Sequence, residues 1–345
     1  MQLFIHVYKL QLISPTGIEY QIVLKKSYRI ILNHLNTNNF KKVLIMNILE
    51  TSHLTFNYRN HSVLEDINLK IPEGSIYGYL GKNGEGKSTT IKILLGLEQT
   101  KINTVFFNKK EFHSNRLHIL QNIGCLIEQP FFYADLSAYE NLNYLDILYH
   151  CGQKRIQEVL ELVNLTKDKD KKVRKYSTGM KQRLGIAMAI FHNPKLLILD
   201  EPLNGLDPQG VFEMRELMLK LKSKGKTIFI SGHILAEMEK ICTHIGILNN
   251  KRLLFQGEMN SLLNQKKQSY LIHTDQPERC MKICKEHLIP TKRISDGTLI
   301  IEIEQDGSFD SFKKLMQQNH IQIIFADTYQ ENLESVFLHL IKTDL

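Results

Sequence analysis

Apolar positions follow a strand pattern in some parts of the chain and a helical pattern in others. Ile76–Leu80 (IYGYL) is a short apolar run that is typical of a buried strand. Leu196–Leu199 (LLIL) and Lys226–Ile230 (KTIFI) predict two more strands. Ser88–Leu97 has apolar residues at helical spacing, so the first of these strands leads through a turn into a helix. This alternation predicts an α/β fold.

The pattern changes beyond Gly257. Asn260–Ser269 is polar and predicts a linker. Strand and helix patterns then alternate over six short segments, YLIHT, PERCMKICKEHL, TLIIEIEQ, SFDSFKKLMQQNH, IQIIFADT and ENLESVFLHLIK. We therefore expect a small C-terminal α+β domain over residues 260–345. Its sequence shows no nucleophile, metal cluster or phosphate loop, which favours packing, dimer support or regulation over catalysis.

Composition excludes several classes of protein. The 345 residues are 43% hydrophobic and 23% charged, enough to bury a large core in two domains, and no apolar run approaches the roughly 18 residues that a membrane span needs.

The net charge of +8 is concentrated near the N-terminus. Six basic residues and one acidic residue place +5 of it in residues 1–45. The run Lys167–Lys175 mixes signs and is typical of a solvated helix end, so we expect no nucleic-acid partner.

Five scattered cysteines fit a reducing compartment better than a disulfide framework. Cys280 and Cys284 lie one helical turn apart, with no further Cys or His close by. We therefore interpret them as packing residues and expect no metal site there.

Residues 81–90 read GKNGEGKSTT and lie between the first predicted strand and its helix. Glycines let a backbone form a nest of N–H donors, and the helix N-terminus adds a partial positive charge at the same place. The phosphate-loop pattern G-x-x-x-x-G-K-[ST] is met by Gly81, Gly86, Lys87 and Ser88. Lys87 would reach the β- and γ-phosphates and the Ser88 hydroxyl would ligate Mg²⁺. A merely flexible glycine-rich turn is the alternative, which the flanking strand and helix disfavour.

Two acidic residues, Asp200 and Glu201, directly follow the predicted strand Leu196–Leu199. Open α/β sheets bind ligands at the carboxyl ends of their strands, where the phosphate loop also lies. Asp200 would hold Mg²⁺, directly or through water, and Glu201 would orient or deprotonate the attacking water. An acidic strand-to-turn pair is common in isolation. Together with a phosphate loop it predicts hydrolysis of ATP or GTP.

Three further stretches distinguish among phosphate-loop families: YSTGMKQRLGIAMAI (residues 176–190), LNGLDP (203–208) and SGHILAEME (231–239). With these motifs in this order, the chain resembles the ATP-binding subunit of an ABC transporter over about Asn47–Gly257. The resemblance implies a P-loop NTPase fold, with an ABC ATPase cassette over residues 46–259 that includes a helical signature subdomain. It also implies ATP and Mg²⁺ as cofactors.

The resemblance assigns roles to individual residues. Glu201, His233 and Lys87 are the implied catalytic residues, with Glu201 as the catalytic carboxylate and His233 as the switch histidine that contacts the γ-phosphate. Ser88 and Asp200 are the implied metal ligands. Tyr58 matches the aromatic residue that stacks on adenine, although an ordinary strand tyrosine is the alternative. The implied nucleotide-binding residues are Tyr58, Gly81, Asn83, Gly84, Gly86, Lys87, Ser88, Thr89, Ser177, Gly179 and Asp207.

The stretch YSTGMKQ resembles the family signature LSGGQ. Ser177 and Gly179 are retained, whereas Tyr176, Thr178 and Met180 depart from it. In the family this signature caps the γ-phosphate bound by a second copy of the cassette. Because one chain supplies one phosphate loop and one signature, the resemblance predicts a head-to-tail dimer with two ATP molecules between the copies.

The Q-loop departs further from the family pattern. Glu128 stands where the family usually has Gln, and Gln129 follows one residue later. A carboxylate accepts hydrogen bonds and carries charge, whereas an amide both donates and accepts. The Glu resembles exporters of the bacitracin and lantibiotic immunity type. Either residue remains a candidate for the functional Q-loop position.

The resemblance also implies a partner and a location. We expect an integral membrane transport subunit on a separate chain, contacted by the surface around Glu128–Asn141, and hence a cytoplasmic protein peripheral to the inner face of the cell membrane. The expected cargo is an antimicrobial peptide, and lipids, drugs and ions stay open as alternatives. A soluble non-transport ABC factor is disfavoured because such factors carry two cassettes, and a chromosome ATPase would need a long heptad insertion.

Residues 1–45 lie outside the cassette pattern. The family usually begins near MNILETSHLTF, where Met46 stands in frame. The preceding segment lacks the compact apolar core and the small-residue cleavage site of a signal peptide. We therefore expect residues 1–45 to be an extension, with Met46 as a possible true start.

Overall fold

The computed structural model describes residues 9–13, 19–23, 46–128, 130–263, 267–304, 309–329 and 332–343. The chain divides between Ile45 and Met46 into two units, which are described separately. In the first unit, strands β1 (Lys9–Ile13) and β2 (Glu19–Val23) pair antiparallel. They carry none of the predicted functional residues.

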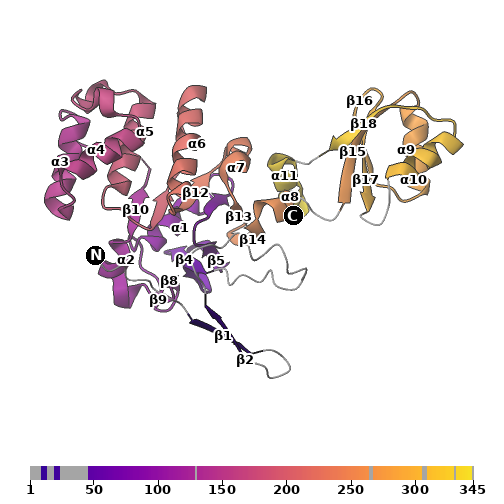
Figure 1. Ribbon diagram of the computed structural model, residues 1–345. Coiled ribbons are helices and arrows are strands. Elements are labelled where there is room, and N and C mark those ends of the chain that lie inside the picture. The colour runs from indigo at the N-terminus through magenta and orange to yellow at the C-terminus, as the bar shows by residue number, and fades with distance from the viewer. Residues whose placement is uncertain are drawn as a thin grey trace. The chain divides into compact units, whose positions relative to one another are not determined.

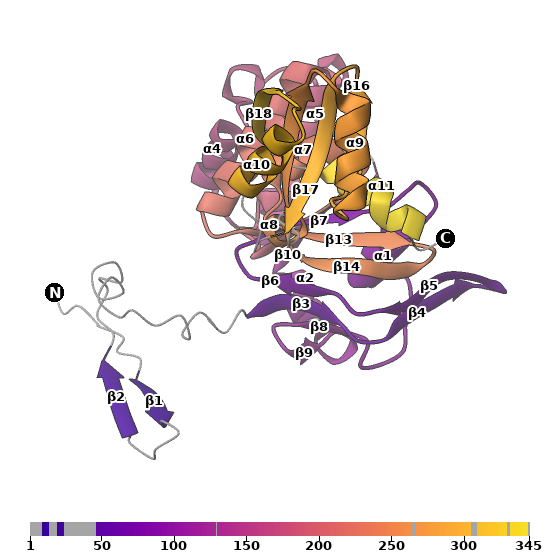
Figure 2. The same ribbon diagram turned by 90° about the vertical axis from the view of Figure 1, so that its right-hand side faces the viewer.

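A six-stranded sheet forms the centre of the second unit, and its spatial order is β10-β11-β12-β7-β13-β14. All neighbours are parallel except the antiparallel pair β13 and β14, which Figure 2 shows side by side. The strands are β7 (Ile76–Leu80), β10 (Ile123–Leu126), β11 (Leu196–Leu199), β12 (Thr227–Gly232), β13 (His244–Asn249) and β14 (Arg252–Glu258). The α/β class expected from the sequence is confirmed.

Both faces of this sheet are covered, which explains why its strands are continuous apolar runs. Along β11, Leu197 and Leu199 belong to one hydrophobic core, whereas Leu196 and Ile198 belong to another. The second core includes α1 (Lys87–Leu94) and lies next to α2 (Arg116–Leu120). The first core includes α5 (Thr178–Ile190), α6 (Pro208–Ser223) and α7 (Leu235–Ile241). Helix α1 ends three residues earlier than the pattern predicted, because Gly96 turns the chain at φ +67°.

Two smaller antiparallel sheets complete this part of the unit. One has the order β6-β3-β8-β9, and the other is a two-stranded ribbon of β4 and β5. Their strands are β3 (Asn47–Thr51), β4 (Leu54–Tyr58), β5 (His61–Ile67), β6 (Lys70–Pro72), β8 (Val105–Phe107) and β9 (Lys110–Glu111).

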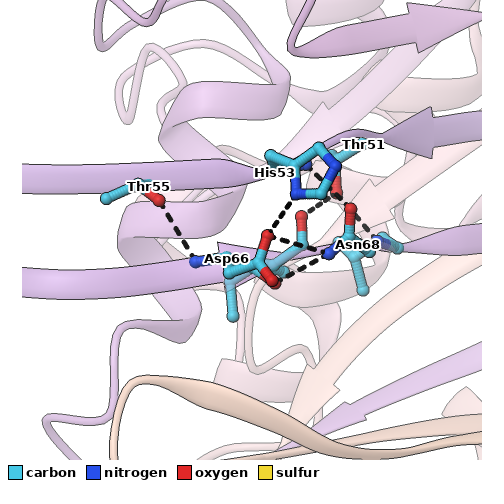
Figure 3. Close-up of polar contacts among 7 residues, drawn as sticks. Thr51, His53, Thr55, Asp66 and Asn68 are labelled. Carbon is cyan, nitrogen blue, oxygen red and sulfur yellow. Dashed lines mark hydrogen bonds and ion pairs between the residues drawn. The ribbon is translucent and has the colours of Figure 1, made fainter.

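A polar network at one end of the β4–β5 ribbon fixes where the ribbon begins (Figure 3). His53 Nδ1 lies 2.6 Å from Asp66 Oδ1, and the His53 backbone N–H donates to Asn68 Oδ1 at 2.8 Å. The Asp66 backbone N–H donates to Thr55 Oγ1 at 3.1 Å. Tyr58 stands at the other end of β4.

Three helices, α3 (Ala138–Tyr149), α4 (Gln153–Leu162) and α5, pack on one another as a helical group (Figure 1). Helix α3 begins with a capping box, in which the Ser137 hydroxyl accepts from the Glu140 N–H and the Glu140 carboxylate accepts from the Ser137 N–H. This group contains the predicted signature at the start of α5.

The C-terminal part forms a four-stranded antiparallel sheet of order β16-β17-β15-β18, with α9 and α10 on one face (Figure 2). The chain order of these elements is βαββαβ. They are β15 (Lys267–Thr274), α9 (Pro277–Glu286), β16 (Thr291–Ser295), β17 (Thr298–Glu304), α10 (Phe309–Gln318) and β18 (Ile323–Tyr329). Helix α8 (Met259–Leu263) precedes the sheet and α11 (Leu333–Thr343) follows it.

Two expectations for this part were wrong. The polar stretch 260–269 is not only a linker, because it contains most of α8, with Leu262 buried, and the start of β15. Strand β16 was not expected, because its residues are mostly exposed and charged and show no apolar alternation. Cys280 and Cys284 are fully buried in the core of the sheet and its helices, as packing residues should be. The positions of the domain boundaries stay a prediction.

Candidate functional site

The register of the central sheet gathers the predicted residues at one edge. Strand β12 lies between β7 and β11, with Gly232 opposite Leu80 and Ile230 opposite Leu199. The three strands are parallel, so the phosphate loop, the acidic pair and the switch histidine all follow strand ends at the same edge.

The phosphate loop depends on glycine at three positions. Gly84 and Gly86 have φ of +87° and +103°, a conformation that residues with a side chain rarely adopt. A Cβ at Gly81 would lie 2.8 Å from the Leu248 carbonyl oxygen, so only glycine fits there. Gly86 caps α1 without a side-chain hydrogen bond, and the first turn of the helix has no acidic residue. The N–H groups at this helix start are therefore suited to an anion.

Lys87 is a buried cation at the start of α1. Its Nζ donates to the carbonyl oxygens of Gly81 at 2.8 Å and Lys82 at 3.2 Å and lies 3.8 Å from Glu201 Oε1. Burial lowers the pKa of Lys87, and the carboxylates of Glu201 and Asp200 partly oppose that shift. The lysine is thus held inside the loop that would surround a phosphate. Asn83, Ser88 and Thr89 are at least partly exposed around it.

The acidic pair at the end of β11 is joined to β12 by a serine that the sequence analysis missed. Ser231 Oγ donates to Asp200 Oδ1 at 2.6 Å and accepts from the Glu201 N–H at 2.9 Å. Asp200 is buried, and its own N–H donates to the Leu126 carbonyl oxygen at 2.8 Å. Ser231 is the first residue of the motif SGHILAEME and lies two residues before His233. Its place in that motif is the one sequence feature that could have indicated a role beside the acidic pair.

Glu201 and His233 are in direct contact, with Nδ1 of the histidine 2.6 Å from Oε2 of the carboxylate. Glu201 has φ +49°, an unusual backbone conformation for a residue with a side chain. Its two carboxylate oxygens thus face Lys87 on one side and His233 on the other. The structure brings together the three residues for which the sequence implied catalytic roles.

Tyr58 lies at the tip of β4, with 43% of its surface exposed and its ring edge-on to Phe56 at 4.9 Å between centroids. Its hydroxyl donates to Glu98 Oε1 at 2.8 Å, and this bond is the main reason that the Tyr58 pKa is raised. Glu98 was not predicted, because it lies in the loop after α1 and belongs to no motif. An exposed ring with a fixed orientation can stack on a planar base.

Glu128 follows β10 at φ +54° and forms an ion pair with Lys92 of α1 at 3.0 Å. Lys92 was not predicted, although it lies one helical turn beyond Ser88. Gln129 lies outside the described residues, so the choice between the two Q-loop candidates stays open.

The signature residues form a second, separate group. Ser177 caps α5 by accepting from the Met180 N–H at 3.2 Å, and Asp207 caps α6 by accepting from the Gly210 N–H at 2.8 Å. Ser177, Gly179 and Asp207 line one open pocket of about 320 Å³. Among the described residues, no member of the phosphate loop lines this pocket.

The oxygen ligands predicted for Mg²⁺ suit that ion. A hydroxyl and a carboxylate are hard donors, and Mg²⁺ in nucleotide sites usually adds phosphate and water oxygens to one or two protein ligands. No group of three His, Cys, Asp or Glu residues in the described ranges could hold a metal without such help. Ser88 and Asp200 therefore fit a metal that arrives with a nucleotide.

Known proteins show similarity to this chain in sequence and in structure. The family model for ABC transporters matches residues 64–204. The bacitracin transport ATP-binding protein BcrA of Bacillus licheniformis is 38% identical over 298 residues, which are 85% of this chain and 97% of that protein. The lantibiotic transport ATP-binding protein SrtF of Streptococcus pyogenes is 39% identical over 217 residues, which are 63% of this chain and 93% of that protein.

Solved structures agree with the sequence comparison. An ATP-binding subunit of an ABC transporter superposes with a TM-score of 0.57 and 31% identity, over 63% of this chain and 92% of that one. The protein cbiO1 of Clostridium perfringens, part of the ABC transporter complex cbiONQ, superposes with a TM-score of 0.59 and 26% identity, over 69% and 95% of the two chains.

Across the ranges that the structure describes, every helix is too short or too polar to span a bilayer.

The expected P-loop NTPase fold is confirmed by the solved cassettes. The expected resemblance to bacitracin and lantibiotic relatives is confirmed as well. This chain belongs to the family of ABC transporter ATP-binding subunits, which bind and hydrolyse ATP.

Proposed function

We propose that this chain powers the export of an antimicrobial peptide of the bacitracin or lantibiotic class through a separate membrane subunit. The observation that carries the proposal is the similarity to a bacitracin transport ATP-binding protein over nearly the whole length of that protein. That similarity extends past the region matched by the general family model, which ends at residue 204. The two named relatives, BcrA and SrtF, transport bacitracin and lantibiotics, which favours this class of cargo.

Hydrolysis would use the three residues that the structure brings together. Lys87 would hold the β- and γ-phosphates, because its buried ammonium lies among the loop carbonyls at the helix N-terminus. Glu201 would orient the attacking water and take its proton, and His233 would keep that carboxylate in place and contact the γ-phosphate. Mg²⁺, held by Ser88 and Asp200 with the nucleotide, would neutralise charge that develops on the phosphates.

A second copy of the chain would complete each site. The signature residues Ser177 and Gly179 line a pocket that includes no phosphate-loop residue of the same chain. Head-to-tail pairing would place this pocket over the nucleotide of the partner copy, so that closing the pair excludes water and assembles the catalytic groups.

The membrane subunit would dock on an exposed aromatic surface next to the Q-loop. Phe131 is 88% exposed, and Tyr133 and Tyr144 are more than half exposed with their ring centroids 5.2 Å apart. Aromatic side chains that lie exposed and next to one another are suited to contact another protein. Docking there would hold the chain at the inner face of the cell membrane and would link the surface around Glu128–Asn141 to the nucleotide.

Susceptibility of the native host to a panel of peptide antibiotics tests the proposal. We expect Glu201→Gln to raise sensitivity selectively to bacitracin or to lantibiotics, because the pump would bind ATP and fail to turn over. Glu334→Gln makes the same chemical change on the exposed face of α11 and should leave the host resistant. Unchanged sensitivity to every peptide in the Glu201→Gln strain would contradict this cargo.

A further inference from the structure

Helix α7 begins shortly after His233 and packs closely against strands β7 and β12 of the central sheet. The helix begins at Leu235, two residues after His233. A Cβ at Gly232 would lie 3.0 Å from Met238 Sδ, and a Cβ at Gly78 of β7 would lie 2.7 Å from Cys242 Sγ. A side chain at Gly78 would force Cys242 to shift, and one at Gly232 would press on Met238, so the helix lies very close to both strands. A displacement of α7 would therefore disturb its packing against β7 and against the end of β12, which His233 directly follows.

Helix α11 covers α7 with a buried apolar face. Leu333, Val336, Phe337 and Ile341 belong to the same hydrophobic core as Met238 and Ile241 of α7. All four side chains are less than 9% exposed, although α11 lies more than ninety residues further along the chain. Figure 1 shows α11 next to α8, which it also contacts. Helix α11 is thus part of the hydrophobic core that also contains α7.

One hydrogen bond fixes α11 to α7 at a defined position. Glu239 Oε2 accepts from the Leu333 backbone N–H at 2.7 Å. Leu333 is the first residue of α11, so Glu239 satisfies a donor that the helix itself leaves unpaired. Asn332 Oδ1 accepts from the Ser335 N–H at 2.9 Å and caps the same turn. Glu239 therefore sets where α11 begins relative to α7.

The βαββαβ sheet is inserted between two helices that contact each other. Its first and last strands, β15 and β18, are neighbours, with Ser269 opposite Tyr329. Helices α8 and α11, which flank the sheet in the chain, are in contact. The sheet thus lies in the chain between two helices that both belong to the hydrophobic core of the cassette.

From this arrangement we infer that Glu239 and α11 are positioning elements for His233: they hold α7 so that the histidine meets Glu201. Neither touches the proposed nucleotide site, so they act on hydrolysis only through α7. The inference rests on the proposed function, because it assumes that His233 contributes to hydrolysis. It gives α11 an influence on the rate of hydrolysis although α11 carries none of the predicted site residues.

The first test compares two substitutions at one residue in the full-length protein. Glu239→Ala removes the acceptor for the Leu333 N–H, whereas Glu239→Gln keeps an acceptor oxygen and removes only the charge. We expect Glu239→Ala to lower kcat about threefold to tenfold, with an unchanged KM for ATP and a melting temperature lowered by no more than about 4 °C, and Glu239→Gln to restore most of the rate. Glu334→Gln, on the exposed face of α11, is the control and should match the parent protein.

An unchanged kcat in Glu239→Ala would overturn the inference. So would a fall in kcat accompanied by a matching loss of ATP affinity and melting temperature, because that outcome indicates a merely structural role. Equal losses in the Ala and Gln variants would also count against it, since the proposed contact needs an acceptor and not a charge.

A double-mutant cycle with His233→Ala separates this inference from the proposed function. If Glu239 acts through His233, the effect of Glu239→Ala should vanish in the His233→Ala background, measured on the residual rate. If the two effects simply multiply, the positioning role is wrong. If His233→Ala alone leaves hydrolysis unchanged, the assignment of His233 in the proposed function fails instead.

Discussion

The phosphate side and the signature side of the cassette are built differently. On the phosphate side, Glu201 contacts both Lys87 and His233 within a single chain. On the signature side, Ser177 and Asp207 each cap their own helix and line an open pocket. The phosphate side is therefore arranged within one chain to bind an anion. The signature side instead presents polar residues around an open pocket that, among the described residues, no phosphate-loop residue of the same chain lines.

This difference indicates how binding and hydrolysis can be separated by mutation. Changes on the phosphate side should alter either ATP binding by one copy or the chemical step itself. Changes on the signature side should leave that binding intact and should affect only steps that need two copies. The predictions below test this division, starting from the largest expected effect.

The largest effect is expected for Glu201→Gln on the phosphate side. Loss of a general base costs about a hundredfold to ten-thousandfold in rate, so kcat should fall by that factor. The amide keeps the size of the side chain, and Lys87 still has its two carbonyl partners, so ATP should bind with similar affinity. Steady-state ATPase assays and a fluorescent ATP analogue measure the two quantities. Normal turnover would remove Glu201 from the mechanism.

A second large effect is expected for Gly179→Asp on the signature side. A Cβ at Gly179 would lie 3.8 Å from Leu206 Cδ2, an ordinary contact distance, so the fold should tolerate a side chain there. The new carboxylate would repel the γ-phosphate of the partner copy, and we expect hydrolysis to fall about a hundredfold. ATP binding by one copy and the melting temperature should not change.

Gly185→Ala is the contrasting change on the same helix. Its Cβ would lie 2.7 Å from Pro130 Cβ and 2.9 Å from Leu126 Cδ1, so it should lower the melting temperature. For Gly179→Asp itself, weaker ATP binding by a single copy would contradict the proposal that the phosphate side and the signature side act independently in binding.

The sequence predicted the phosphate side better than the network that supports it. Strands β7 and β11 were found because both of their faces are buried, which leaves an apolar run, and the loop was found because glycines and Lys87 have fixed spacing. Ser231 and Glu98 were missed because their roles depend on strand register and loop position. Contacts between segments far apart in the chain leave no local pattern.

The adenine contact on the phosphate side should show a smaller effect. Stacking of a base on an aromatic ring contributes about 1–3 kcal/mol, so Tyr58→Ala should weaken ATP binding about tenfold or more. Tyr58→Phe keeps the ring and loses only the bond to Glu98, so it should bind ATP within about twofold of the parent. Titration with a fluorescent ATP analogue measures both. Equal ATP affinities for Tyr58→Ala and the parent protein would indicate that Tyr58 is an ordinary strand tyrosine that does not stack on adenine.

The smallest effect concerns pH and again distinguishes the two sides. Burial lowers the pKa of Lys87, and the nearby Glu201 carboxylate opposes this, so Glu201→Gln should lower the pKa further. Lys87 attracts phosphate only when protonated, so as pH rises the variant should lose ATP affinity at a lower pH than the parent. Affinity measured between about pH 7 and pH 10 gives the two curves. Glu213→Gln, which neutralises a carboxylate paired with Arg183 on the signature side, should leave the curve in place. An equal shift in both variants would mean that the phosphate side responds to the overall charge of the cassette and not to the contact between Lys87 and Glu201.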